Sequence, residues 1–194
     1  MLLLILGLAL WYATHLLKPM APARRAELAE RLGGEGSAKI AMAIASVVAV
    51  ALMTIGYQTA GYVQVWTPPA FLVHLNNLLM VIAVILFFAG GVKGHVASWV
   101  RHPQLTGFKL WAVAHLLVNG NLEAIILFGG LLAWAVIALV AINKRDGKGP
   151  KPAPQGLKPN LIHAGASVVA FLVITGAHNW AGYWPFPGSP PGAG

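Results

Sequence analysis

The sequence predicts an all-α, polytopic integral membrane protein of about six transmembrane helices without a water-soluble domain. Hydrophobic residues make up 58% of the 194 residues and charged residues only 9%, against about 25% charged residues in soluble domains. So few charges cannot cover a surface that faces water. The apolar residues also form separate runs, and the basic residues lie between them. This arrangement is typical of apolar spans of about 20 residues joined by short loops.

Hydropathy places the apolar runs at residues 2–17, 40–57, 71–92, 105–118, 122–142 and 161–177. The fourth run is too short for an apolar core of roughly 30 Å at about 1.5 Å per residue. We therefore expect either a re-entrant segment there or a span whose ends are shielded by protein. Together the runs predict a single transmembrane domain over residues 1–186, with a disordered tail at 187–194 and no internal repeat.

The basic residues predict the orientation of these spans. With the N-terminus outside and six crossings, all 13 Lys and Arg residues fall in or beside three cytoplasmic loops. The C-terminus then lies outside as well. Without a crossing by the fourth run, the basic loop after Ile142 would lie outside, so the charge pattern favours a real crossing.

Three segments near the helix ends carry further predictions. The first run resembles a signal peptide, but its positive charges follow the apolar residues, so we expect a retained helix. Residues 23–34 predict a short amphipathic helix at the cytoplasmic surface, with a Glu27–Arg31 pair and a glycine stop. Residues 144–159 are rich in Lys, Pro and Gly, which predicts a flexible linker.

The composition excludes several classes of function. The chain has no cysteine, which excludes disulfides, iron–sulfur clusters, thiolate metal sites and covalently attached c-type haem. The basic residues are spread over the loops and do not form one stripe, so we expect membrane lipids and no nucleic acid as partners. Glu123 is the one acid at the edge of a span, which leaves no carboxylate pair or catalytic triad.

The seven histidines are the main functional signal, because an ionisable residue within a membrane span is costly. His15 lies three residues before Lys18 and His115 six residues after Lys109, which places them about 4.5 and 9 Å deeper than these basic residues. Two imidazoles at similar depth on the cytoplasmic side can hold the iron of a b-type haem, and His163 is a third candidate. The alternative, which spacing alone favours, is a hydrogen bond between helices without a cofactor.

The other histidines suggest different roles. His74 and His178 lie toward the outer side, where we expect them to be too far from that iron to bind it. Arg101 and His102 precede Pro103 at the start of the fourth run. They can bind a phosphate or carboxylate headgroup, although an interfacial anchor at a helix start is the interpretation that the residues alone favour.

Two stretches of this region resemble a known family. Residues 101–107, Arg-His-Pro-Gln-Leu-Thr-Gly, and residues 110–121, Leu-Trp-Ala-Val-Ala-His-Leu-Leu-Val-Asn-Gly-Asn, are similar to the NnrU family of bacterial membrane proteins. That family includes the 15-cis-zeta-carotene isomerases of plants and cyanobacteria. Looser similarity extends from the first run to about His178. The resemblance implies a multi-pass protein of the bacterial inner membrane.

For the isomerase branch, the resemblance also implies a haem b whose iron is held by two histidines. His115 and His15 match those axial ligands, and we place Trp111, Arg101 and His102 in the same cofactor site. The isomerases carry a cysteine three residues before the second histidine as an alternative ligand. Here that residue is Ala112, so such an exchange of ligands is excluded.

The resemblance leaves three functions open. NnrU members are associated with denitrification, which implies a haem protein in redox sensing or in support of nitrite and nitric oxide reductases. An enzymatic alternative is haem-dependent cis–trans isomerisation of a polyene such as zeta-carotene. The third is a non-catalytic scaffold or maturation factor that binds a reductase or electron-transfer partner in the membrane.

Overall fold

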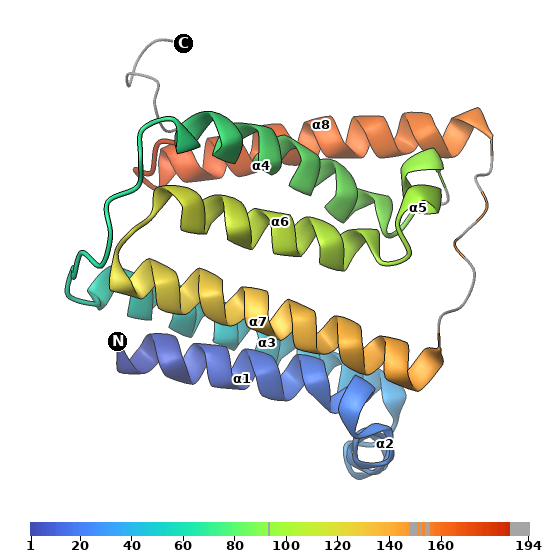
Figure 1. Cartoon of the computed structure of the whole chain (residues 1–194). Helices are drawn as coiled ribbons and strands as arrows, with labels where there is room; N and C mark the ends of the chain where they lie inside the picture. Colours follow the sequence, from blue (N-terminus) through green and yellow to red (C-terminus); the bar gives the residue numbers. More distant parts are fainter. Residues whose placement is uncertain (93, 148–150, 152, 154–155, 187–194) are drawn as a thin grey trace. The chain divides into compact units, whose positions relative to one another are not determined.

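The structure is a computed structural model that describes residues 1–92, 94–147, 151, 153 and 156–186. Over these residues the chain forms helices and one isolated β-bridge, between Gln64 and Asn121 (Figure 1). The helices are α1 (Leu2–Met20), α2 (Pro22–Arg31), α3 (Glu35–Thr59), α4 (Leu72–Ala89), α5 (His95–Trp99), α6 (Pro103–Val118), α7 (Leu122–Asp146) and α8 (Leu157–Trp180). The all-α prediction is confirmed.

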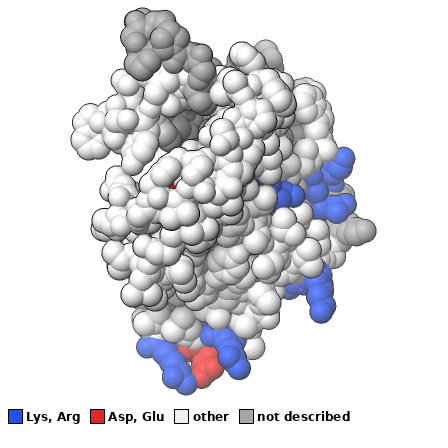
Figure 2. Space-filling model, turned by 60° about the vertical axis from the view of Figure 1, so that its left-hand side comes forward, with Lys and Arg blue, Asp and Glu red and all other residues white. Residues whose placement is uncertain are grey.

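Five of the described helices, α1, α3, α4, α7 and α8, are long and apolar enough to cross a membrane. Their outer surfaces are apolar too, with exposed side chains such as Ile40 and Val47 on α3 and Leu172 and Val173 on α8. Most of the face drawn in Figure 2 carries neither basic nor acidic residues. Surfaces of this kind face lipid and not water, so the chain is a multi-pass membrane protein.

The short fourth run forms α6, a helix of 16 residues. Within this helix Gln104 alone is exposed, as expected for a short segment that is shielded by protein. Whether α6 crosses the membrane stays a prediction, as do the total of six crossings and the outside location of both termini.

Most helices extend beyond the apolar runs, because hydropathy marks only the apolar part of a helix. The helix α3 begins at Glu35 and α7 ends at Asp146. Acidic residues in a first turn and basic residues in a last turn suit the helix dipole, so polar turns continue these helices. The linker predicted from residue 144 therefore starts only after Asp146. The sequence did not predict α5, and the tail at 187–194 lies outside the described residues, as do linker residues 148–150, 152, 154 and 155.

The predicted amphipathic helix in the first loop is confirmed as α2. Arg31 and Glu27 form an ion pair with 2.6 Å between Nη2 and Oε1. The chain leaves α2 through Gly33 and Gly34, whose φ angles of +86° and +118° lie in a region that favours glycine.

The chain divides into two compact units. Unit 1 comprises residues 1–65 and 121–148, and unit 2 comprises residues 66–120 and 149–194. Unit 1 therefore contains α1, α2, α3 and α7, and unit 2 contains α4, α5, α6 and α8. The single transmembrane domain over residues 1–186 stays a prediction.

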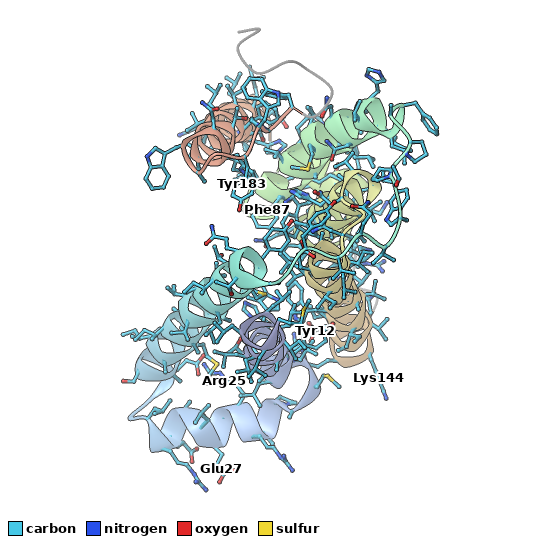
Figure 3. The ribbon with its side chains drawn as sticks, turned by 90° about the vertical axis from the view of Figure 1, so that its left-hand side faces the viewer. Tyr12, Arg25, Glu27, Phe87, Lys144 and Tyr183 are labelled. Carbon is cyan, nitrogen blue, oxygen red and sulfur yellow. The ribbon has the colours of Figure 1, made fainter. Side chains whose placement is uncertain are left out.

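In unit 1 the basic residues gather at one end. Arg145 on α7 donates to the Lys18 carbonyl at the end of α1 (3.3 Å). The buried Arg25 points from α2 toward α3, where it pairs with Glu35 (3.1 Å; Figure 3). The described basic residues at or near this end are Lys18, Arg24, Arg25, Arg31, Lys39, Lys144 and Arg145. The positive-inside rule predicts this grouping for a cytoplasmic end.

In unit 2, α6 and α8 both run antiparallel to α4. A Cβ on Gly107 of α6 would lie 2.5 Å from the Ala83 carbonyl oxygen of α4, and His163 of α8 contacts the Ile85 carbonyl of α4 (2.7 Å). The N-terminal ends of α6 and α8 thus lie beside the C-terminal end of α4. There, Lys151 donates to the Trp99 carbonyl (2.8 Å). We call this the basic end of unit 2, because Arg101, Lys151 and Lys158 lie there.

Candidate functional site

The first candidate ligand, His15, lies half-buried on α1 in unit 1. Its Nδ1 is 3.0 Å from the Trp11 carbonyl oxygen and 2.9 Å from Thr14 Oγ1. Because the Thr14 hydroxyl donates to backbone carbonyls of its own helix and a carbonyl only accepts, a proton on Nδ1 satisfies both contacts. The ring stacks on Trp11 with 3.8 Å between centroids and meets Trp134 edge-on at 5.4 Å. Nε2 is therefore the nitrogen with which His15 can coordinate a metal.

The second candidate, His115, has the same local arrangement on α6 in unit 2. Its Nδ1 is 3.0 Å from the Trp111 carbonyl oxygen, so Nε2 is again the coordinating nitrogen. The Trp111 ring lies 5.0 Å from the imidazole, and Phe108 lies 5.1 Å from Trp111. Aromatic side chains thus flank both histidines along their own helices.

This likeness has a basis in the sequence, and it corrects the prediction that the chain has no internal repeat. Residues 7–17 and 107–117 share the pattern Gly-x-x-Leu-Trp-x-x-x-His-Leu-Leu, with identity at six of eleven positions. We call them the two Trp–His segments. Hydropathy runs do not reveal the repeat, because they average over residue types. The repeat is visible in the individual residues, which recur at an offset of 100 positions.

The glycine of each Trp–His segment packs against an antiparallel neighbour. A Cβ on Gly7 would lie 2.7 Å from the backbone nitrogen of Met53 in α3, and one on Gly107 would lie 2.6 Å from that of Phe87 in α4. Only a residue without a Cβ allows helices to approach so closely. The two segments therefore share their packing as well as their hydrogen bonds.

A family model described as NnrU protein matches residues 3–185 of this chain. The chain belongs to the NnrU family. The match includes both Trp–His segments and reaches from α1 to beyond α8. No curated protein and no solved structure matches the sequence.

A further polar residue that the sequence analysis missed holds α6 of this NnrU protein in place. Asn76 of α4 is 4% exposed, and in the amide orientation that satisfies its polar atoms, Nδ2 donates to the Ala114 carbonyl (2.9 Å). Ala114 directly precedes His115, so this bond fixes the backbone next to the candidate ligand. The signal in the sequence is an Asn-Asn pair within an apolar run.

His163 differs from the other two candidates. It is buried on α8, and its Nε2 lies 2.7 Å from the Ile85 carbonyl oxygen of α4. Nε2 therefore carries the proton, which leaves Nδ1 as the nitrogen that can coordinate. This contact is the helix-to-helix hydrogen bond that we considered as the role of a histidine without a cofactor.

Arg101 and His102 lie at the start of α6, with His102 as the residue before its first turn. The His102 carbonyl accepts from Thr106 N (2.9 Å), as at any helix start. Thirteen residues separate His102 from His115, which amounts to about 20 Å along the helix axis. The structure thus does not bring this pair together with His115, whereas Trp111 lies directly beside it.

The structure gives the position of His115 along α6. The expectation of 9 Å was counted from Lys109, and α6 begins six residues before that residue, at Pro103. His115 therefore lies about 18 Å along α6 from its basic end and three residues before its C-terminus. His15, by contrast, lies five residues before the end of α1, toward the basic end of unit 1.

The donor set fits haem better than a metal ion held by protein alone. Among the described residues, no group of three or more His, Cys, Asp or Glu side chains is placed to hold a metal. Structural zinc needs about four protein ligands and catalytic zinc about three, whereas a haem iron needs only one or two axial ligands. Histidines with a fixed Nδ1–H and aromatic neighbours meet that requirement.

Proposed function

We propose that this NnrU protein binds haem b in the bacterial inner membrane and acts in redox sensing or in support of denitrification. His115 is one axial ligand in this proposal. The sequence predicts His15 as the second ligand, with His163 as the alternative. The observation that carries the proposal is the hydrogen bond from Nδ1 of both His15 and His115 to the carbonyl of the preceding tryptophan.

That hydrogen bond makes the imidazole a suitable ligand for an iron ion. It holds the tautomer whose Nε2 carries the lone pair, orients the ring and raises its basicity. The aromatic residues on the same helices supply the apolar contacts that a porphyrin ring requires. Haem, when bound, would supply one-electron redox chemistry.

The apolar outer surface indicates where partners bind. Side chains such as Val47 and Leu172 are exposed on the long helices and face lipid. A reductase or electron-transfer partner that binds these helices would therefore lie in the membrane as well. Family membership supports the link to denitrification. A scaffold without haem remains the competing proposal, and it predicts a partner that co-purifies with colourless protein.

The haem-dependent isomerisation of a polyene is a second candidate function. The observation that favours it is the aromatic row Phe108, Trp111 and His115 on α6, because a polyene needs an apolar surface beside the histidine. Analysis of carotenoids in producing cells under reducing conditions tests it. The expected product is the all-trans polyene, and its absence would contradict this function.

The absorption spectrum of the purified full-length protein tests haem binding. We expect a Soret band that shifts on reduction, and we expect His115→Ala to change it. The matched control is His95→Ala, since His95 is exposed on the short helix α5 and is expected to leave the spectrum unchanged. A protein without a Soret band after haem supplementation, or an unaltered spectrum in His115→Ala, would contradict the proposal.

A further inference from the structure

The charged residues are divided unequally between the two units. The sequence of unit 1 contains all five acidic residues of the chain and eight of its 13 Lys and Arg residues, whereas that of unit 2 contains five basic residues and no Asp or Glu. In unit 1, Arg25, Arg31 and Arg145 each form an ion pair with one of these acids. The positive charge of unit 2 is thus not balanced by any Asp or Glu side chain of its own.

Three of the five basic residues of unit 2 lie at its basic end. Arg101 comes two residues before the start of α6, and Lys158 lies in the first turn of α8. Both helices begin beside the C-terminal end of α4, as described above. Lys151 belongs to the segment before α8, and its Nζ donates to the carbonyl of Trp99, two residues before Arg101 (2.8 Å). The fold therefore brings together three cations from distant parts of the sequence.

The short helix α5 holds this arrangement together. At its start, His95 N donates to Oδ1 of Asn160 on α8 (2.8 Å). Gly94 lies so close to the same side chain that a Cβ would be 2.7 Å from Oδ1. At the other end of α5, the Trp99 carbonyl accepts from Lys151. Both ends of α5 are thus bonded to α8 or to the segment before it, and α5 lies near the starts of α6 and α8 (Figure 1).

The backbone adds to the positive charge of these side chains. The helices α6 and α8 have 16 and 24 residues, and each begins at the basic end of unit 2. The N-terminal end of a helix carries a partial positive charge and backbone N–H groups without a partner in the helix. Side chains and backbone together therefore favour the binding of an anion at this end.

Apolar side chains are exposed beside the basic ones. Trp99, Leu157 and Leu161 are 66%, 71% and 63% exposed. Leu157 and Leu161 are four residues apart and share one face of α8, and tryptophan is enriched at membrane interfaces. An inorganic anion makes no use of such side chains, whereas a phospholipid places acyl chains directly beside its charged headgroup. The surface therefore fits a lipid better than a free anion.

We propose that the basic end of unit 2 is a binding site for one anionic phospholipid. The phosphate of the headgroup is bound by Arg101, Lys151 and Lys158, and the acyl chains lie along Leu157 and Leu161. This site is separate from the proposed haem site, because Arg101 and His115 lie toward opposite ends of α6. Lipid binding therefore does not depend on the proposed function.

Titration of lipid into the purified full-length protein in detergent tests the proposal, with bound lipid counted by native mass spectrometry. We expect one tightly bound phosphatidylglycerol per chain and much weaker binding of phosphatidylcholine, whose headgroup has no net charge. Each Lys or Arg near a membrane surface strengthens the binding of anionic lipid about fivefold. The triple variant Arg101→Gln, Lys151→Gln, Lys158→Gln is therefore expected to bind phosphatidylglycerol about 100-fold more weakly.

The matched control removes the same charge from exposed positions of unit 1. The triple variant Arg24→Gln, Lys39→Gln, Lys144→Gln is expected to bind phosphatidylglycerol as the wild type does. An equal loss of binding in both triple variants would overturn the proposal, because it would show attraction by overall charge. Equal binding of phosphatidylglycerol and phosphatidylcholine by the wild type would also overturn it.

A single substitution guards against a folding defect in the triple variant. Lys158→Gln leaves the hydrogen bonds of α5 intact, and it is expected to weaken phosphatidylglycerol binding about fivefold. Wild-type affinity in Lys158→Gln would contradict the proposal. Inorganic phosphate that displaces the lipid at equal concentration would contradict it too, because the ligand would then be a free anion.

Discussion

The two Trp–His segments share a local structure but differ in what surrounds them. In unit 1 the His15 ring stacks on Trp11 at 3.8 Å and has Trp134 as a second aromatic neighbour. In unit 2 the His115 ring is tilted to Trp111 at 5.0 Å, and Phe108 lies 5.1 Å from Trp111. The shared sequence thus goes with the same histidine hydrogen bond and the same close helix packing, whereas the aromatic neighbours of the two rings differ.

The largest expected effect concerns the glycines that both segments share. Replacing Gly7 or Gly107 by Val places side-chain atoms against the backbone of α3 or α4, and such overpacking costs typically about 1–3 kcal/mol or more. We expect a clear fall in the melting temperature of the purified protein in detergent for each variant. Gly165→Val is the control, because a Cβ there meets nothing within 4 Å; an equal loss in all three would refute the close approach.

The next effect tests the difference between the two histidines. We expect His115→Ala to lose more of the bound haem than His15→Ala, because His163 is an alternative to His15 as the second ligand, and we expect each variant to lose about 1 kcal/mol of stability from one hydrogen bond. The measurements are the haem content after purification and the melting temperature. Equal haem loss in both variants would mean that the two segments act alike.

A smaller effect is expected at Asn76, for which unit 1 offers no equivalent. Asn76→Leu removes the side-chain donor to the Ala114 carbonyl beside His115, and the net loss of one such hydrogen bond costs about 0.5–1.5 kcal/mol. We expect a lower melting temperature and an altered Soret band with haem still bound. Asn179→Leu, at an exposed position on α8, serves as the control. A spectrum that is unchanged in Asn76→Leu would show that the bond does not hold His115 in place.

The smallest effects are expected in the two ion pairs of α2. Arg31 and Glu27 are both largely exposed, so Glu27→Gln is expected to change stability by less than about 0.5 kcal/mol. Glu35→Gln is expected to cost more, because its partner Arg25 is 8% exposed and loses its charged acceptor. Melting curves at low and high salt measure the difference, and a greater loss for Glu27→Gln would reverse this ranking.

The sequence predicted most of the fold because the apolar runs are long and the signals at their ends are local. The glycine stop after α2 and the Glu27–Arg31 pair depend on residues within one or two turns, and both were found. The helix α5 was missed because five residues between two loops carry no periodicity. The depth of His115 in the membrane stays a prediction, because its distance from Lys109 along α6 is the expected one.

The candidate site was less predictable. The sequence indicated His115 and Trp111, since they lie in one motif. It did not indicate that Asn76 bonds the backbone beside His115, or that α6 and α8 begin beside the same end of α4. Those relations join residues that lie far apart in the chain, and they depend on the packing of whole helices. Hydropathy and spacing contain no information about that packing.

The ratio of haem to protein in the purified wild-type chain tests the central claim most directly. The account predicts one haem b per chain, with a low-spin spectrum in both oxidation states, because two histidines share one iron. Two haems per chain would mean that each Trp–His segment binds its own. Protein that takes up no haem under supplementation would contradict the account altogether.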